Sequence, residues 1–353
     1  MMLRAARSFV PLCAAVTVAV ALAGCGGAPR ARTSPAVATG SSTAVAPPAS
    51  QVPGAAVPAG LWVSDINANV VTDFHAPPAS TPTTVVAKGL THPEALAFDS
   101  RGNLWVGDGG PSPAILEFAA GGLAAGSGPA AVIDTRGTSP EGLAFDSRGN
   151  LWVAAGTALV EFGAGALGHN PSPSKVITSS VLDGPCSLAF DPLGRSLWVA
   201  NFNNRVLLEY PARSLSAAHP EPGLHIQLPG GTAPFGIAFD SKGDLWVPGQ
   251  NDTVDEYAAR TLGTTSTPSA TIDMSTLISG GALSLAFDSP GDLWVSAIGS
   301  GSSGAPEGMV YEYAARTLGT TSTPSARLVA STSSNPGTWA LAFYPVPASL
   351  GPR

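Results

Sequence analysis

The sequence predicts an all-β protein, a six-bladed β-propeller built from four-stranded blades. The tripeptide Leu-Trp-Val occurs six times, and its tryptophans are 43 to 48 residues apart, at positions 62, 105, 152, 198, 246 and 294. Repeats of this length are typical of propellers and solenoids. The 353 residues also include 41 Gly and 33 Pro, a density that interrupts long helices and suits short strands joined by turns.

The first two strands of each repeat form a predicted hairpin. A run of the type Leu-Ala-Phe-Asp leads through a Gly-containing turn into Leu-Trp-Val. Two β-rich runs joined by Asp, Gly and Asn are a hairpin signature, because Gly supplies the positive φ that the turn requires. Complete copies span residues 96–106, 143–153, 188–200, 237–247 and 285–295.

The third and fourth strands follow at fixed distances. The third carries an acid–aromatic pair in every repeat, such as Glu117-Phe118 or Glu256-Tyr257, and a short apolar run such as residues 130–133 follows. Of 24 aromatic residues, 18 fill three repeat positions, which predicts a core between stacked blades. We expect the paired acids to be solvated or bonded locally, since they are spread around the whole ring.

The two ends of the repeat region complement each other. The first Leu-Trp-Val has no Ala-Phe-Asp before it, and the last Leu-Ala-Phe has no Leu-Trp-Val after it. We therefore expect a C-terminal strand at 341–344 to join the N-terminal strands at 61–87 in one blade. This arrangement closes the ring and removes the open sheet edges that a solenoid would leave.

The N-terminal region predicts an exported, anchored protein. Arg4 and Arg7 precede an apolar run at 9–22, and Leu-Ala-Gly ends before Cys25; the run is too short for a stable membrane span. The motif resembles a bacterial lipobox, which implies a signal peptide at 1–24, lipidation of Cys25 and an extracytoplasmic location on the cell membrane. An ordinary secretory signal is the alternative. Residues 25–58, rich in Ala, Pro, Ser and Thr, are expected to be a disordered tether, with the propeller at 59–353.

Charge and composition restrict the partners. The net charge is −7, and loss of Arg4 and Arg7 with a signal peptide makes it −9, which repels nucleic-acid phosphates. We therefore expect no nucleic-acid binding, and we expect a monomer. Of three cysteines, Cys13 lies in the signal and Cys25 is the lipidation candidate, so the mature chain has no intramolecular disulfide partner for Cys186.

The repeated pattern of Leu-Ala-Phe-Asp, a Gly turn and Leu-Trp-Val over 59–353 resembles the NHL-repeat and gluconolactonase-like (senescence marker protein) group of six-bladed propellers. This resemblance implies that the first strand of each blade lines a central channel and that ligands or metals sit at one channel mouth. Aligning the blades places six residues at that mouth, immediately after the position usually held by the Pro that opens the first strand: Glu94, Glu141, Cys186, Phe235, Leu283 and Trp339.

Antiparallel geometry brings the ends of the second strands to the same face. This adds Asp65, Asp108, Asn201, Phe202, Asn203, Asn204 and the 250–252 loop, while His92 alone among five histidines borders the mouth. The predicted ligand-binding residues are Glu94, Glu141, Cys186, Phe235, Trp339, Phe202 and Asn201. The oxygens of Asp65, Glu94, Asp108 and Glu141 are candidates for Ca²⁺ or another divalent cation, which takes six or more oxygen ligands; the alternative is that these groups cap strand ends and face water.

Two functions remain open from the sequence. The first is a membrane-anchored binding module that takes a small molecule, glycan or envelope protein at the channel mouth, because the chain shows no complete catalytic set. The alternative is a divalent-metal-dependent enzyme of the lactonase or lyase type that uses mouth carboxylates. A Ser/Gly-rich stretch at 297–308 is expected to form a longer loop on the ligand face.

Overall fold

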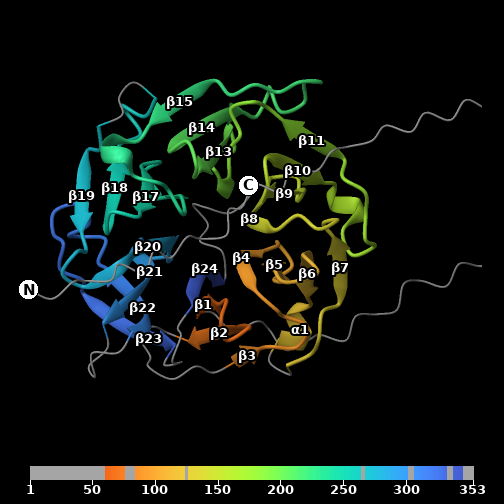
Figure 1. The fold of residues 1–353 in the computed structure, drawn as a ribbon, viewed down its shortest axis with the longest axis horizontal. Helices are drawn as coiled ribbons and strands as arrows, with labels where there is room; N and C mark the ends of the chain where they lie inside the picture. Colours follow the sequence, from red (N-terminus) through yellow and green to blue (C-terminus); the bar gives the residue numbers. More distant parts are fainter. Residues whose placement is uncertain are drawn as a thin grey trace, which may run out of the picture.

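The chain forms a ring of six four-stranded antiparallel sheets, shown in Figure 1. The computed structural model describes residues 60–75, 84–123, 126–263, 267–300, 306–331 and 337–344. The predicted signal peptide at 1–24, the lipidation candidate Cys25 and the tether at 25–58 lie outside these residues. Within the described part of the chain, no helix has the length and hydrophobicity needed to span a bilayer.

Each sheet is one blade, numbered in chain order, and its strands are hydrogen-bonded in the order given. Blade one contains β24 (Thr338–Tyr344), β1 (Gly60–Asp65), β2 (Val70–His75) and β3 (Thr84–Val86). Blade two contains β4 (Pro93–Phe98), β5 (Leu104–Asp108), β6 (Ala114–Phe118) and β7 (Ala131–Asp134). Blade three contains β8 (Pro140–Phe145), β9 (Leu151–Ala155), β10 (Ala158–Phe162) and β11 (Lys175–Thr178).

Blades four to six follow the same plan. Blade four contains β12 (Pro185–Phe190), β13 (Ser196–Asn201), β14 (Val206–Pro211) and β15 (Leu224–Gln227). Blade five contains β16 (Ala238–Phe239), β17 (Leu245–Gly249), β18 (Thr253–Tyr257) and β19 (Ala270–Asp273). Blade six contains β20 (Ile278–Phe287), β21 (Leu293–Ser300), β22 (Pro306–Tyr313) and β23 (Ala326–Ser331). The helical segments are α1 (Ala120–Leu123), η1 (Ala164–Ala166) and η2 (Pro229–Gly231).

The predicted closure of the ring is confirmed. Strand β1 lies between β24 and β2, and Gly60 pairs with Tyr344 on one side and with His75 on the other. The closing strand begins at Thr338, three positions before the predicted start at 341, because pairing continues to Asp65 after a register shift. Both described ends of blade one, Gly60 and Tyr344, therefore lie at the same end of the sheet.

The hairpin turns use a repeated aspartate. In blade two, Asp99 Oδ1 accepts the backbone N–H groups of Arg101 and Asn103, at 2.8 and 2.9 Å. The Asn103 amide then bridges two acids, donating to Asp99 Oδ2 and to Glu117 Oε1, each at 2.9 Å. Asp146, Asn150 and Glu161 repeat the bridge in blade three, at 2.9 and 3.0 Å. The third-strand acids of these blades are thus bonded locally.

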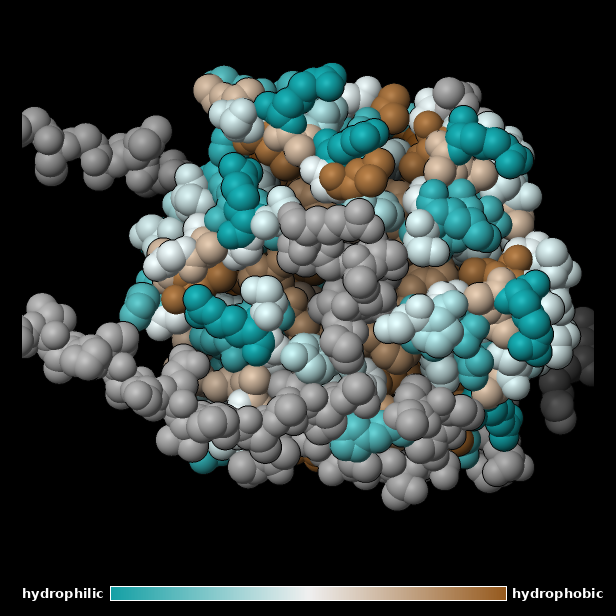
Figure 2. Space-filling model, turned by 180° about the vertical axis from the view of Figure 1, so that it is seen from behind, coloured by the Kyte–Doolittle hydropathy of each residue, from teal (hydrophilic) through white to brown (hydrophobic). Residues whose placement is uncertain are grey.

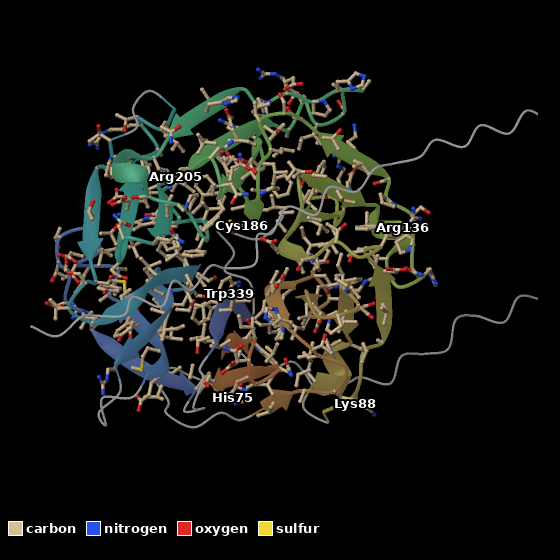
Figure 3. All side chains as sticks on the ribbon, in the orientation of Figure 1. His75, Lys88, Arg136, Cys186, Arg205 and Trp339 are labelled. Atoms are coloured by element: carbon tan, nitrogen blue, oxygen red, sulfur yellow. The ribbon has the colours of Figure 1, made fainter. Side chains whose placement is uncertain are left out.

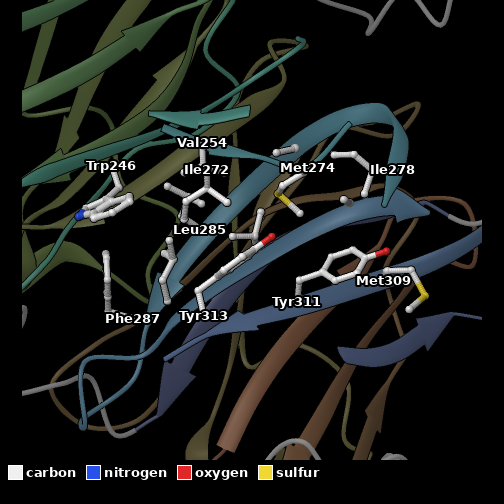
Figure 4. Packing of buried hydrophobic residues seen from close by; sticks show 14 residues of the cluster. Trp246, Val254, Ile272, Met274, Ile278, Leu285, Phe287, Met309, Tyr311 and Tyr313 are labelled. Carbon is white, nitrogen blue, oxygen red and sulfur yellow. The ribbon is translucent and has the colours of Figure 1, made fainter. Parts of the chain in front are cut away.

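The predicted aromatic core joins neighbouring blades. Each second-strand tryptophan contacts, edge to face, the first-strand phenylalanine of the next blade, as Trp152 does with Phe190. The six ring-centroid distances are 5.7 to 6.5 Å and the interplanar angles 63 to 72°, the geometry that aromatic quadrupoles favour. Figure 4 shows one such junction, where Trp246 of blade five lies beside Phe287 of blade six.

The prediction of a loop at 297–308 is wrong for most of this stretch. Strand β21 continues to Ser300 and β22 begins at Pro306, with Ile298 paired to Gly308 and Gly299 to Glu307. Most of the insertion therefore extends a hairpin, because the added residues satisfy each other's backbone groups. Within this stretch, residues 301–305 lie outside the described residues.

Candidate functional site

A cavity of about 370 Å³ lies at the end of the channel where the first strands begin. We call it the mouth cavity. All six blades contribute to its wall, including the six residues that the blade alignment places at one level: Glu94, Glu141, Cys186, Phe235, Leu283 and Trp339. Figure 3 shows Cys186 and Trp339 beside the centre of the ring, whereas Lys88 and Arg136 lie at its outer edge. The volume is within the range of small-molecule sites.

A β-bulge positions these residues. In blade two, Pro93 pairs with Asp108 and Ala95 with Gly107, so Glu94 is the extra residue between two pairs. The same shift leaves Glu141, Cys186 and Leu283 as extra residues in blades three, four and six. Blades one and five also have one more residue on the first-strand side than on the second-strand side. A bulge redirects a side chain out of the ladder, which here means into the channel mouth.

One side of the mouth cavity is acidic. Glu94 Oε1 lies 2.9 Å from His92 Nδ1, and Glu94 Oε2 accepts a hydrogen bond from the Ser139 hydroxyl of the next blade. The hydrogen bond to Glu94 raises the pKa of His92, and the charges of Glu94 and Asp108 act in the same direction, against the effect of burial. Glu141 lines the neighbouring part of the wall.

Blades one, four and five contribute aromatic rings to the wall of the mouth cavity. The rings of Phe202 and Phe235 are 5.0 Å apart and tilted by 41°, and Phe235 meets Trp339 at 5.9 Å and 74°. Phe202, Phe235 and Trp339 are each half-buried. Cys186 is nearly buried beneath them, and its thiol donates to the Pro234 carbonyl at 3.2 Å. The thiol therefore contributes to packing between blades four and five.

The four predicted cation ligands are not brought together. Among the residues that the structure describes, no group of three His, Cys, Asp or Glu side chains is placed to hold one metal ion. Asp65 Oδ1 accepts the backbone N–H groups of Asn67, Ala68 and Gly337, at 2.9 to 3.1 Å. Asp108 accepts those of Thr91, His92 and Gly110. Both carboxylates cap loops, as the alternative left open by the sequence expects, but both are buried and do not face water.

The structure also corrects the predicted position of Asn201 at the channel mouth. The predicted mouth residue is fully buried, and its amide donates to Val181 O and to Asn204 Oδ1, each at 2.7 Å, while its oxygen accepts from the Asp183 N–H. It fixes a loop of blade four and is absent from the cavity wall. The 250–252 loop is also outside the wall; Asp252 Oδ1 instead accepts the Gly281 N–H at 2.8 Å.

Sequence reasoning missed two contributors. Ser139, one residue before the opening Pro of blade three, fixes Glu94 across the blade boundary. Ile66, which follows the end of β1, lines the mouth cavity. A hydroxyl directly before Pro140 is a visible signal, but its partner on another blade depends on how the blades stack.

A second cavity continues the channel at its opposite end. Its volume is about 210 Å³, and six Ala-Phe pairs, one from each first strand, dominate its wall: 97–98, 144–145, 189–190, 238–239, 286–287 and 342–343. The side chains of the described part of this wall are all apolar. In the space-filling view of Figure 2, hydrophilic residues lie mostly toward the outside of the ring and apolar residues nearer its centre. Of the two cavities, only the mouth cavity has polar side chains among its described lining residues.

Comparison with known proteins identifies the fold. No family model and no curated protein matches this chain. Several solved structures do match. A Bacteroides caccae protein of unknown function has 12% sequence identity and a TM-score of 0.59, and the match covers 81% of this chain and 98% of that one. The nidogen/laminin complex contains a chain with 12% identity and TM-score 0.60, covering 82% and 99%. A functionally unknown protein from Desulfotomaculum acetoxidans has 14% identity and TM-score 0.54, covering 80% and 85%. These likenesses show a six-bladed β-propeller.

Proposed function

We propose that this propeller is a non-enzymatic binding module that takes a small molecule in the mouth cavity. The fold itself is typical of binding and interaction modules. The observation that carries the finer proposal is the composition of the cavity wall, which combines a fixed Glu94 with the aromatic rings of Phe202, Phe235 and Trp339. Small-molecule sites are usually mainly apolar with a few placed polar groups.

The location is part of this proposal. We propose that Cys25 is lipidated and holds the domain at the outer face of a membrane through the 25–58 tether. The geometry is compatible with this role, because the chain enters blade one at Gly60, which pairs with Tyr344 at the end of the ring opposite Trp339. A tether at that end leaves the mouth cavity accessible.

The metal-dependent lactonase or lyase alternative has no observation in its favour. Asp65 Oδ1 and both oxygens of Asp108, which belong to two of the four candidate ligands, accept backbone N–H groups that a hard cation would have to displace. Asp65 Oδ2 is buried and has no hydrogen-bond partner among the described residues, but no two further His, Cys, Asp or Glu side chains of the described part are placed to share a metal ion with it. We therefore do not carry this alternative further.

The binding proposal is tested by ligand-observed NMR with a small fragment library of mixed charge. Trp339→Leu removes one wall of the mouth cavity and is expected to weaken cavity-binding fragments at least tenfold. Val176→Ala, on the exposed face of β11, is the matched control and should leave binding unchanged. If every fragment binds both variants as it binds the unaltered protein, the mouth cavity is not the binding site.

The anchor is tested separately in a bacterial host. The full chain should partition into the detergent phase of Triton X-114, and Cys25→Ser should return it to the aqueous phase. A wild-type chain that stays aqueous, or partitioning that the substitution does not alter, would exclude lipidation at Cys25. Neither result affects the cavity proposal, because the two rest on different residues.

A further inference from the structure

The apolar cavity at the end of the channel opposite the mouth has a wall of one chemical kind. Six Ala-Phe pairs, one from each first strand, line it, and Ile237 and Leu285 line both this cavity and the mouth cavity. The two cavities therefore belong to one channel. The alanines of the pairs are each half-buried: Ala97, Ala144, Ala189, Ala238, Ala286 and Ala342. Apolar surface gathered in one place usually marks a contact site.

Blade one differs from the other blades at this end of the channel. In blades two to six the residue after the Phe is an Asp that begins the turn into the second strand: Asp99, Asp146, Asp191, Asp240 and Asp288. In blade one the same position holds Tyr344, and β24 joins β1 by pairing alone, without a hairpin turn. The Tyr344 ring contacts Phe98 of blade two, with ring centroids 5.1 Å apart. The rim of the apolar cavity is thus aromatic where blade one ends.

The chain leaves blade one directly from the wall of this cavity. Strand β24 runs from the mouth residue Trp339 toward Tyr344, and its Ala342 and Phe343 belong to the wall of the apolar cavity. Figure 1 shows β24 nearer the centre of the ring than β1, the strand on which Gly60 lies. The residues after Tyr344 therefore begin beside the cavity, whereas those before Gly60 begin one strand farther out.

The residues that follow Tyr344 have the composition of a buried segment. The sequence of 345–350 is Pro-Val-Pro-Ala-Ser-Leu, without a charged side chain. Six extended residues reach about 20 Å at about 3.3 Å per residue, farther than a compact cavity of about 210 Å³ is wide. Pro345 and Pro347 restrict the unfolded chain, so ordering this segment costs less conformational entropy than ordering a Gly- or Ser-rich one.

We infer that residues 345–350 fold across the apolar end of the channel and that their apolar side chains cover the ring of Ala-Phe pairs. Burial of apolar surface on both sides of this contact is the driving force. The segment closes the channel opposite the mouth cavity, so a ligand of the mouth cavity enters and leaves on one side only. It also keeps the apolar ring from contact with lipid or with a second copy of the chain. The closure is independent of ligand binding at the mouth.

A nitroxide label tests the position of the segment directly. The label is attached at Ser349→Cys in the chain from residue 26 on, with Cys186→Ser, and the alanine methyl signals are recorded by NMR. Ala189 of blade four lies across the ring from blade one. Its signal should lose at least half of its intensity when the label is oxidised, because the segment crosses the channel. The same label at Val85→Cys, on the exposed face of β3 in blade one, is the matched control and should leave Ala189 unchanged.

Removal of the segment supplies a second measurement. Benzene binds in dry apolar cavities of proteins, and here it reports whether the apolar cavity is free. A chain that stops at Tyr344 should bind benzene saturably, with shifts of the alanine methyl signals of the cavity wall. A chain that stops at Leu350 keeps the proposed cover and should show no such shifts, like the unshortened chain. Thermal unfolding of each chain shows whether the fold is retained.

Three results would overturn the inference. The first is a label at position 349 that broadens Ala342 and Ala97, beside the exit of the chain, but not Ala189. The second is benzene binding of equal strength with and without residues 345–353, which means that the segment does not occupy the cavity. The third is exclusion of benzene by both chains, which means that the tether, a lipid or a second copy fills it. If the chain that stops at Tyr344 does not fold, the labelling result alone decides.

Discussion

Replacing Asp244 by Asn is expected to stabilise blade five. Asn103 and Asn150 bridge two carboxylates in blades two and three, and Asp244 occupies the same position of the repeat. Its Oδ1 still accepts the Ala259 N–H at 2.7 Å, as Asn103 Oδ1 accepts that of Ala120. A carboxylate has no N–H to offer to the neighbouring acids, so three carboxyl groups meet where blades two and three have two carboxyl groups and an amide.

The charges of this group act on one another. Burial raises the pKa of Asp240, and the charge of Asp244 contributes in the same direction, whereas the backbone N–H groups of Asp244 and Lys242 and the charge of Lys242 lower it. Burial likewise raises the pKa of Glu256, with smaller contributions from Asp244 and Asp240. A raised pKa means that the native state binds the proton more tightly than the unfolded chain. The stabilisation is therefore complete below the unfolded-state pKa and is lost as the pH rises through the folded-state value.

The expected gain follows from the bonds restored. A hydrogen bond to a charged group contributes about 1.5–3 kcal/mol when buried, and half-exposure of Asp244 and Glu256 reduces this to about 1–2 kcal/mol. At about 2 °C per kcal/mol for a domain of this size, Asp244→Asn should raise the Tm at pH 7 by about 2–4 °C. The gain should shrink toward pH 4, where the acids of the unaltered protein become protonated.

Calorimetry of the unaltered protein and Asp244→Asn at pH 7 and pH 4.5 measures both effects. Asn103→Asp is the reciprocal control and should lower the Tm at pH 7, because it removes the amide bridge of blade two. An unchanged or lower Tm for Asp244→Asn at pH 7, or an equal gain at both pH values, would refute the account of the carboxyl group.

Three further predictions concern the core, the mouth and the closure. The hydroxyls of Tyr210, Tyr257 and Tyr313 are buried and have no hydrogen-bond partner within the described part of the chain, at positions where the first three blades have Phe. Burial raises the pKa of Tyr210 to about 12. Tyr210→Phe should leave the Tm equal or raise it by about 2 °C, and a lower Tm would mean that the hydroxyl is bonded. NMR titration should give His92 a pKa above 6.5 that falls in Glu94→Gln, and a pKa unaffected by that substitution would contradict the pairing. Ending the chain at Ser331 removes β24 and exposes an edge of β1; loss of cooperative unfolding is expected, whereas an unchanged Tm would show that closure is dispensable.

Much of the architecture was predictable because the sequence repeats its strands. Position within the repeat predicts Trp152 and Phe190 as core residues, and their rings are in contact in the structure. The same alignment placed Glu94 and Trp339 at one level of the channel, and both line the mouth cavity. That these residues bind a ligand stays a prediction.

The orientation of single polar side chains was not predictable. Asp65 and Asn201 lie at strand ends near the mouth, yet each turns to satisfy loop backbone groups. Which N–H or C=O groups a loop leaves unsatisfied depends on its folded path, and a buried unsatisfied group costs more than a surface contact gains. The contact of Ser139 with Glu94 depends in the same way on the stacking of two blades.

The pairing of Gly60 with both Tyr344 and His75 also has a mechanical consequence. A pull on the chain before Gly60, directed away from the ring, runs lengthwise along β1. The ladders to β2 and β24 then share the load in shear, so several hydrogen bonds must break together instead of one after another. Force enters at the end of the ring remote from the mouth cavity. The strand ladders of blade one therefore bear the tension before the shape of the mouth cavity is affected.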